Sequence, residues 1–234
     1  MTDNLFGQKA FTLIELMVAM AIAGIISAAI YSVYISQVRT QIAQEVAIEL
    51  QQGLRGAISI MTQEIRTAGA DPLGDANAGI VTASEEEFHF TRDIVGDPDT
   101  GQYDGEINHD EEDIRYVLDG EQLQRWTGGS SPPDQPGIIL DNVEILEFLY
   151  WVYSNDDDEL RIMNSEDEPD DIRRIDVTIV ARSSQSDRGL LRRHTDTREY
   201  RNQDGDVILK PVDYDESARR MKLSTTIKRR NLRN

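Results

Sequence analysis

The sequence predicts an α+β fold, in which a long N-terminal helix packs against an antiparallel β-sheet head. An uncharged apolar run near the N-terminus is followed by an apolar stripe at steps of three or four residues, which ends at Ala68. Alternating strand-like segments separated by turn signals fill the rest of the chain. We therefore expect a polar leader (1–10), a helix in two halves (11–35 and 36–70) and a β-rich head (71–234).

The first half of the helix has the length and composition of a membrane span. Residues 16–35 contain no charge, and 20 helical residues cover the roughly 30 Å of a bilayer core. A secretory signal peptide would place its small-residue cleavage site after the apolar run. Here the polar leader comes before the run and ends in Ala10. Removal of this leader would leave the apolar helix on the mature protein.

Glu15 is the only charged residue between residues 11 and 35, and this segment offers no oppositely charged partner. An unpaired charge inside hydrocarbon is costly and is a functional hypothesis by default. Two interpretations follow. Glu15 either stays hydrated at the membrane edge, or meets a positive group that another chain supplies.

Residues 10–16, Ala-Phe-Thr-Leu-Ile-Glu-Leu, resemble the class III signal of type IV pilins and type II secretion pseudopilins. The resemblance implies that a membrane prepilin peptidase cuts between Ala10 and Phe11 and that Phe11 is N-methylated. It also implies that Glu15, the fifth mature residue, pairs with the amino terminus of a neighbouring subunit. The family usually has glycine before the cut, and Ala10 is small enough to allow processing, at a slower rate. A cut after Gly7 would move Glu15 out of this register.

The second half of the helix is amphipathic, and its apolar stripe is expected to pack on the head. Gly69 and Asp71-Pro72 predict the helix end. Three glycines inside the helix are potential points of bending or close helix approach. The stripe consists of Val38, Ile42, Val46, Leu50, Leu54, Ile58, Met61, Ile65 and Ala68, and the glycines are Gly24, Gly53 and Gly56.

In the head, alternation predicts a single antiparallel sheet with one face toward the helix and the other toward water. Asp119-Gly120 predicts a hairpin. Residues 183–218 are mostly polar and are expected to form a long surface excursion around the apolar cluster 207–209. The expected strands are residues 80–83, 87–91, 114–118, 122–126, 143–153, 172–182 and 220–228.

Composition excludes several classes of function. A net charge of −19 argues against direct nucleic-acid binding, and the absence of cysteine excludes disulfides and thiolate sites. The three histidines, His89, His109 and His194, are scattered and are expected to be ordinary surface or strand residues. No catalytic motif occurs, so we expect no enzymatic activity.

Charge is unevenly distributed along the chain. Residues 1–170 hold 8 basic and 33 acidic side chains, whereas residues 171–234 hold 16 basic and 10 acidic ones. The basic C-terminal part contacts an acidic partner, or the two parts are solvated faces of one domain.

Two acidic segments suggest a bound cation, calcium, and no other cofactor is expected. Asp97, Asp99 and Asp104 alternate in a turn-rich stretch, and residues 156–159 form an acidic run. The first segment is not an EF-hand, because Gln102 and Asn108 stand where the motif needs glycine and glutamate. A solvated acidic loop is the alternative interpretation.

Three further segments are similar to PilW-type minor pilins and J-type pseudopilins: residues 64–69, 143–153 and 223–232. The resemblance implies a minor pilin that primes or caps filament assembly, with the prepilin peptidase, other pilins and the inner membrane as partners. Its head would face the periplasm before the subunit enters the filament. The alternatives are a type II secretion pseudopilin and, in a different class, a single-pass membrane-anchored sensor or binding protein.

Overall fold

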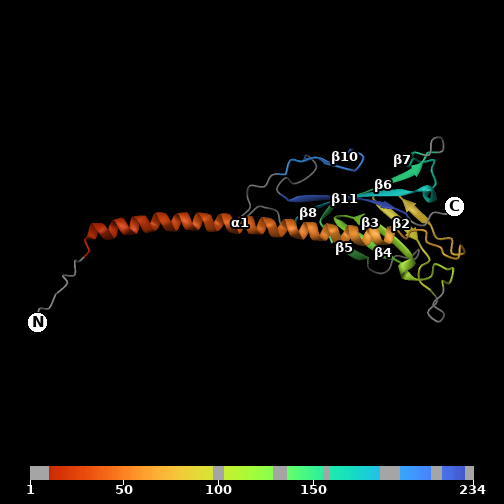
Figure 1. Ribbon diagram of the computed structural model, residues 1–234, viewed down its shortest axis with the longest axis horizontal. Coiled ribbons are helices and arrows are strands. Elements are labelled where there is room, and N and C mark those ends of the chain that lie inside the picture. The colour runs from red at the N-terminus through yellow and green to blue at the C-terminus, as the bar shows by residue number, and fades with distance from the viewer. Residues whose placement is uncertain are drawn as a thin grey trace, which may run out of the picture. The chain divides into compact units, whose positions relative to one another are not determined.

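A computed structural model describes residues 11–96, 103–128, 136–154, 159–184, 196–211 and 218–229 (Figure 1). The chain divides into two compact units at Glu45 and Val46. We refer to the described residues before this boundary as the N-terminal unit, and to those from Val46 onward as the C-terminal unit.

Helix α1 runs from Leu13 to Ile65. It passes through all three of its glycines without a break, so none of these predicted weak points interrupts the helix. The last turn tightens, because Thr67 and Ala68 donate to carbonyls three residues earlier. Gly69 then adopts a positive φ of 72°, which ends the helix where the sequence predicted.

The last turns of α1 bury one face in the core of the C-terminal unit. Leu54, Ala57, Met61 and Ile65 are each at most 1% exposed, at spacings of three and four residues. This confirms Leu54, Met61 and Ile65 of the predicted stripe, whereas the predicted Ile58 is only partly buried and Ala57, which was not predicted, is fully buried. The side chains pack with residues of two β-sheets, so the helix and both sheets share a single hydrophobic core.

The first sheet has five antiparallel strands in the order β1-β2-β3-β4-β5. Asp119 pairs with Gln122, which leaves Gly120 and Glu121 as a two-residue loop and confirms the predicted hairpin. Figure 1 shows the C-terminal part of α1 beside β3, β4 and β5. The strands are β1 (Ile80–Ala83), β2 (Glu87–Thr91), β3 (Asp113–Asp119), β4 (Gln122–Thr127) and β5 (Gly137–Asp141).

A second antiparallel sheet has the order β11-β8-β6-β7. Seven consecutive residues of its central strand β8 are buried, so this strand is covered on both faces. The expectation of one sheet with a face toward water was therefore wrong, because a second sheet and a hairpin cover the additional apolar surface. The strands are β6 (Val143–Tyr153), β7 (Leu160–Ile162), β8 (Arg174–Arg182) and β11 (Arg220–Lys228).

The region expected to be a surface excursion contains ordered structure in residues 196–211. Strands β9 (Tyr200–Arg201) and β10 (Val207–Leu209) form a small hairpin. Tyr200 and Leu209 are less than 10% exposed and pack on Val180 of β8. The hairpin thus covers one face of the second sheet, and the prediction of an exposed excursion was wrong for these residues.

Two short 3₁₀ helices complete the described elements, η1 (Asp110–Glu112) and η2 (Pro169–Asp171). The predicted strand began at residue 172, but β8 begins at Arg174, and the turn of η2 explains this difference. The amide of Ile172 donates to Pro169 and closes the 3₁₀ turn, so it is not available to the sheet. Strands β5, β7, β9 and β10 were not predicted.

Candidate functional site

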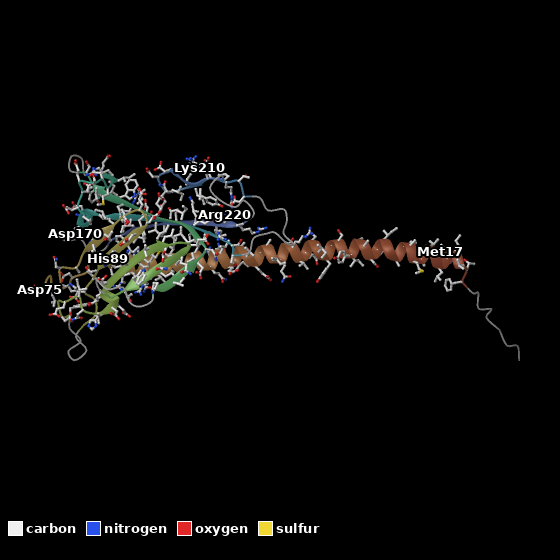
Figure 2. All side chains as sticks on the ribbon, turned by 180° about the vertical axis from the view of Figure 1, so that it is seen from behind. Met17, Asp75, His89, Asp170, Lys210 and Arg220 are labelled. Atoms are coloured by element: carbon white, nitrogen blue, oxygen red, sulfur yellow. The ribbon has the colours of Figure 1, made fainter. Side chains whose placement is uncertain are left out.

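The surface of residues 11–34, within the N-terminal unit, is apolar on all sides of the helix apart from Glu15. Every residue from 11 to 34 is exposed, and these residues include fourteen large hydrophobic side chains. Figure 2 labels Met17 among them, and its exposed fraction is 62%. Helix α1 is long and apolar enough to cross a membrane. Such a contiguous apolar surface is suited to lipid or to other apolar helices.

Glu15 lies in the first turn of α1 and forms a capping box with Thr12. The Thr12 amide donates to Glu15 Oε2 at 2.9 Å, and the Thr12 hydroxyl bonds the same oxygen at 3.1 Å. The Glu15 amide in turn donates to Thr12 Oγ1 at 3.3 Å. The sequence contains no charged partner for Glu15 in this segment. The neutral partner Thr12 was not predicted, although the pattern Thr-x-x-Glu is a known helix-start signal.

The capping box uses only one of the two carboxylate oxygens of Glu15. Both Thr12 bonds reach Oε2, whereas Oε1 has no hydrogen bond within the described residues. The helix surface around the carboxylate is formed by Ile14, Val18, Ala19 and Ile22. A single carboxylate oxygen therefore faces outward from an apolar surface, where a cationic group of another molecule could reach it.

Only one of the two residues at the predicted cleavage point, Phe11, is among the described residues. Ala10 lies outside the described residues, and the cut before Phe11 stays a prediction. Phe11 is 87% exposed and precedes the first helical residue by two positions. A protease or a methylating enzyme could therefore reach it without unfolding α1.

A second functional element, absent from the sequence prediction, holds the end of α1 to the first sheet. Glu64 accepts two hydrogen bonds from Arg125 of β4, from Nε at 2.9 Å and from Nη2 at 2.8 Å. Tyr116 of β3 donates its phenolic hydroxyl to the same carboxylate. Glu64 belongs to residues 64–69, which the sequence analysis singled out only for their similarity to minor pilins and pseudopilins.

Burial and the charge of Glu64 both shift the pKa values of Tyr116 and Arg125. Burial raises the pKa of the Tyr116 phenol well above its usual value, and the neighbouring Glu64 charge raises it further. Burial lowers the pKa of Arg125, but the hydrogen bond and charge of Glu64 raise it overall. Tyr116 therefore remains a protonated donor and Arg125 remains charged throughout the physiological range.

A close approach at Gly69 adds another contact behind the helix end. A Cβ atom at Gly69 would lie 2.6 Å from Nη2 of Arg229, the residue that follows β11. The Arg229 guanidinium is buried and donates from Nη1 to the carbonyl oxygens of Asp170 and Ile172. Gly69 thus serves two purposes, a positive φ and space for a buried cation.

Two described arginines of the basic C-terminal part pair with carboxylates of the acidic part, within the C-terminal unit. Arg220 of β11 is buried and bonds Glu144 through Nε at 2.5 Å and Nη2 at 2.9 Å. Arg182 of β8 bonds Glu121 at 2.5 Å and lies 3.6 Å from Glu144. These pairs join the acidic and basic parts of the chain inside one domain.

The histidines form no common site in the described residues. His89 lies on β2, with Nε2 at 2.6 Å from Asp113 Oδ1 of β3, and Figure 2 labels it within the C-terminal unit. His109 precedes η1, and its amide donates to Glu112. His194 lies outside the described residues.

The predicted calcium residues are only partly in view. Asp97 and Asp99 lie outside the described residues, as do residues 156–158 of the acidic run. Asp104 is described, and its carboxylate accepts the Glu106 amide at 3.0 Å and the Asn108 side-chain amide at 3.1 Å. The described residues contain no group of three or more His, Asp or Glu that could hold a metal by side chains alone.

Comparison with known proteins adds three findings. Residues 5–31 match the family model of the prokaryotic N-terminal methylation motif. A fimbrial protein of Dichelobacter nodosus is 34% identical over 110 residues, which are 47% of this chain and 67% of that protein. A fimbrial protein of Neisseria meningitidis serogroup B is 34% identical over 88 residues, which are 37% of this chain and 49% of that protein.

Among solved structures, a type IV-like pilin from Thermus thermophilus is similar to this chain. The match covers 79% of this chain and 98% of that one, with a TM-score of 0.48 and 13% sequence identity.

Proposed function

Because this chain belongs to the type IV pilin-like fimbrial proteins, we propose that it is a minor pilin, which joins a type IV pilus through its N-terminal helix and primes or caps filament assembly. One observation carries the proposal. Exposed Phe11 lies two residues before a helix whose first turns are apolar on all sides, and Glu15 in the first helical turn has one carboxylate oxygen without a hydrogen bond in the described residues, inside the matched methylation motif.

The proposal assigns a sequence of states to the chain. It first lies in the bacterial inner membrane as a single-pass protein with its head in the periplasm. Prepilin peptidase then cuts between Ala10 and Phe11, and the new amino terminus of Phe11 is methylated. In the filament, the apolar surface of the N-terminal unit packs on the helices of other pilins. Glu15 there accepts the terminal ammonium of a neighbouring subunit, a pairing that is strong where water is excluded.

The size of the chain favours a minor subunit over a major one. The same 110 aligned residues make up 47% of this chain but 67% of the Dichelobacter relative, so this chain is the longer of the two. Its head contains two sheets and a covering hairpin within the described residues. A bulky head is compatible with a tip position, where a subunit has fewer neighbours than within the shaft.

Two alternatives are distinguished by experiment. A type II secretion minor pseudopilin of the J type would have the same processed helix but would serve protein export. A membrane-anchored sensor would keep its leader, so mass spectrometry of the purified chain would find Met1 or Thr2 at its amino terminus. N-methyl-Phe11 is the expected result, and an unprocessed amino terminus would contradict the pilin function.

Quantitative proteomics of sheared, purified filaments then tests the minor role. We expect the chain to be present at a small fraction of the main subunit, and its deletion to reduce the number of surface filaments. A deletion that leaves filaments intact but blocks export of folded proteins would instead support the pseudopilin. Complementation with the intact gene controls for effects on neighbouring genes.

A further inference from the structure

The second sheet has two edge strands, β7 and β11, which stand at opposite ends of its strand order (Figure 1). Within the described residues, neither strand has another strand on its outer side. An edge strand presents unpaired backbone groups and can pair with a strand of another molecule. The two edges of this sheet are therefore candidate surfaces for association.

On β7, the outward-facing backbone groups belong to Leu160 and Ile162. The Met163 amide donates to the Tyr150 carbonyl of β6 at 2.8 Å. Hydrogen-bonded pairs alternate along an antiparallel ladder, so Leu160 and Ile162 turn their backbone groups away from β6. The Ile162 carbonyl accepts the Arg161 side chain at 3.3 Å, and the other three groups have no hydrogen bond within the described residues.

The side chains at this edge form an exposed apolar surface. Tyr153, Leu160 and Ile162 are 47%, 36% and 38% exposed. They share one face of the sheet, because Tyr153 is opposite Leu160 in the register and Ile162 lies two positions further along β7. Aromatic residues are enriched at protein interfaces, and a strand that pairs with β7 would cover this surface.

The segment that contains β7 is strongly acidic. Residues 159–171 hold six acidic side chains and one basic side chain, Arg161, which pairs with Asp167 at 2.5 Å. Glu159 precedes the strand, Glu166 lies in the turn that follows it, and both are exposed. A strand that pairs with β7 should therefore carry positive charge.

The opposite edge of the same sheet, β11, has this positive charge. Residues 219–229 hold five basic side chains and no acidic one. Arg220 and Arg229 are buried within the head, whereas Lys222 and Lys228 are exposed. The two edges of one sheet are thus oppositely charged, which favours contact between the β7 edge of one molecule and the β11 edge of another.

The backbone geometry of the two edges is also compatible. The Arg229 amide donates to Arg173 at 3.3 Å, so the outward-facing groups of β11 are those of residues 222, 224, 226 and 228. All neighbours in the order β11-β8-β6-β7 are antiparallel, so β11 and β7 run in opposite directions. Two copies placed side by side with the same face outward therefore bring β7 and β11 together as antiparallel strands, and Ile162 can stand opposite Ser224.

We propose that β7 of one copy of this chain pairs with β11 of a second copy, so that the second sheet continues from one head into the next. The antiparallel arrangement brings Glu159 toward Lys228 and Glu166 toward Lys222. A ladder of three residues is short, so these opposite charges supply a large part of the attraction. Like charges disfavour the symmetric pairings of β7 with β7 and of β11 with β11.

This contact goes beyond the proposed function, because it concerns the head alone and does not depend on the N-terminal helix. It is heterologous, so further copies can add in a row. Two copies are enough to form it, which is compatible with a rare subunit.

Cysteine cross-linking of the full-length chain in detergent micelles tests the proposal, because the chain contains no cysteine of its own. Ile162→Cys and Ser224→Cys are purified separately, one of them with a tag that shifts its mass, then mixed in equal amounts and oxidised. Opposite residues of a hydrogen-bonded antiparallel pair have Cα atoms about 5.5 Å apart, a distance that a disulfide spans. We expect at least about tenfold more mixed dimer than from a control pair.

Ile138→Cys with Ser224→Cys is the matched control pair. Ile138 is 52% exposed and lies on β5, an edge strand of the first sheet. If circular dichroism shows that a site variant does not fold, Leu160→Cys with Thr226→Cys replaces the pair, since these residues are opposite in the same register. Equal cross-linking of the control pair would show association through the micelle alone and would overturn the proposal. Efficient dimers of Ile162→Cys by itself would also overturn it, in favour of a symmetric β7 contact.

Charge reversal tests the basis of the contact. Lys222→Glu with Lys228→Glu, in the copy that carries the cysteine on β11, should reduce the mixed dimer at least about tenfold. Glu159→Lys with Glu166→Lys in the other copy should restore it. Absence of the mixed dimer in the original pair, or a dimer that does not respond to either reversal, would exclude pairing of these edges. Each of these outcomes leaves the amino-terminal test of the pilin function unaffected.

Discussion

Glu64 on the last turn of α1 and Arg125 on β4 form a bidentate ion pair that connects the helix end to the first sheet. The side chains are 17% and 24% exposed, so the pair is largely screened from water. Tyr116 donates a third hydrogen bond to the same carboxylate. Loss of either partner in the folded head would therefore leave the other charge buried without a counter-charge.

The contributions of Glu64 and Arg125 to the stability of the head should not be additive. We expect Glu64→Gln to lower the free energy of unfolding by about 2–3 kcal/mol, because the Arg125 charge stays buried without a carboxylate. The double variant Glu64→Gln with Arg125→Met should lose less than the sum of the two single variants. Urea unfolding followed by the fluorescence of Trp126 and Trp151 measures these values.

Glu199→Gln is the control for this pair. Glu199 pairs with Arg201 at the surface, with both side chains about half exposed, so its loss should change stability by no more than about 0.5 kcal/mol. Strict additivity of the Glu64 and Arg125 variants would show that the two groups do not interact energetically.

Gly69 should tolerate no side chain. Alanine there must adopt a φ of 72°, which costs about 1–2 kcal/mol, and must also displace the buried Arg229 guanidinium. We expect Gly69→Ala to lower the free energy of unfolding by about 2–4 kcal/mol in total. Gly205→Ala is the matched control, since Gly205 also has a positive φ but faces open space. Equal losses in the two variants would exclude a role for the Arg229 contact.

The helix and most strands could be predicted because local patterns determine them. The stripe that includes Leu54 and Met61, the hairpin at Gly120 and the full length of β6 all follow from periodicity and turn chemistry. The division into two sheets could not be predicted, because it depends on which strands pair. Strand β5 is only five residues long, and its pairing with β4 is interrupted by a register shift.

The candidate site likewise was only partly predictable from the sequence. The resemblance implies roles for Phe11 and Glu15 that stay predictions, whereas the capping box of Thr12 and Glu15 was not predicted, although the pattern Thr-x-x-Glu is present in the sequence. Arg229 reaches Gly69 across 160 positions, and no local pattern links them.

Asp196 should make the stability of the head sensitive to acid. Burial raises the pKa of its carboxyl group, but hydrogen bonds from Arg198 and Tyr200 outweigh burial and place the pKa below its usual value of 3.8. Because the pKa is lower in the folded state, the unfolded state takes up a proton first as the pH falls, and stability is lost. The contribution of Asp196 is therefore complete above about pH 5 and is lost gradually as the pH falls from the usual pKa through the lower pKa of the folded state.

Comparison of the wild type with Asp196→Asn isolates this effect from the other carboxylates. We expect the variant to be less stable by about 2 kcal/mol at pH 7, and the difference to narrow steadily below about pH 4. Denaturant unfolding at a series of pH values measures both quantities. A difference that is constant down to pH 2 would show that the hydrogen bonds do not depend on the ionised form.

Glu15 has two separable roles, capping of α1 and pairing with another subunit, and its variants can distinguish them. Glu15→Ala removes both, whereas Glu15→Gln keeps the capping box, because glutamine serves at this position as glutamate does. Thr12→Val removes the hydroxyl of the box and keeps the charge. All three variants should still insert into the membrane, since the apolar run is unchanged.

If pairing governs assembly, Glu15→Gln should behave like Glu15→Ala. Both should enter filaments at least about tenfold less than the wild type, because the ammonium of the neighbouring subunit is left unpaired among apolar helices. Thr12→Val should enter filaments at close to the wild-type level. Quantitative mass spectrometry of membranes and of sheared filaments from the same cells measures insertion and assembly together. Normal incorporation of Glu15→Gln would mean that Glu15 acts through the helix start alone, and the charge-pairing role would then be abandoned.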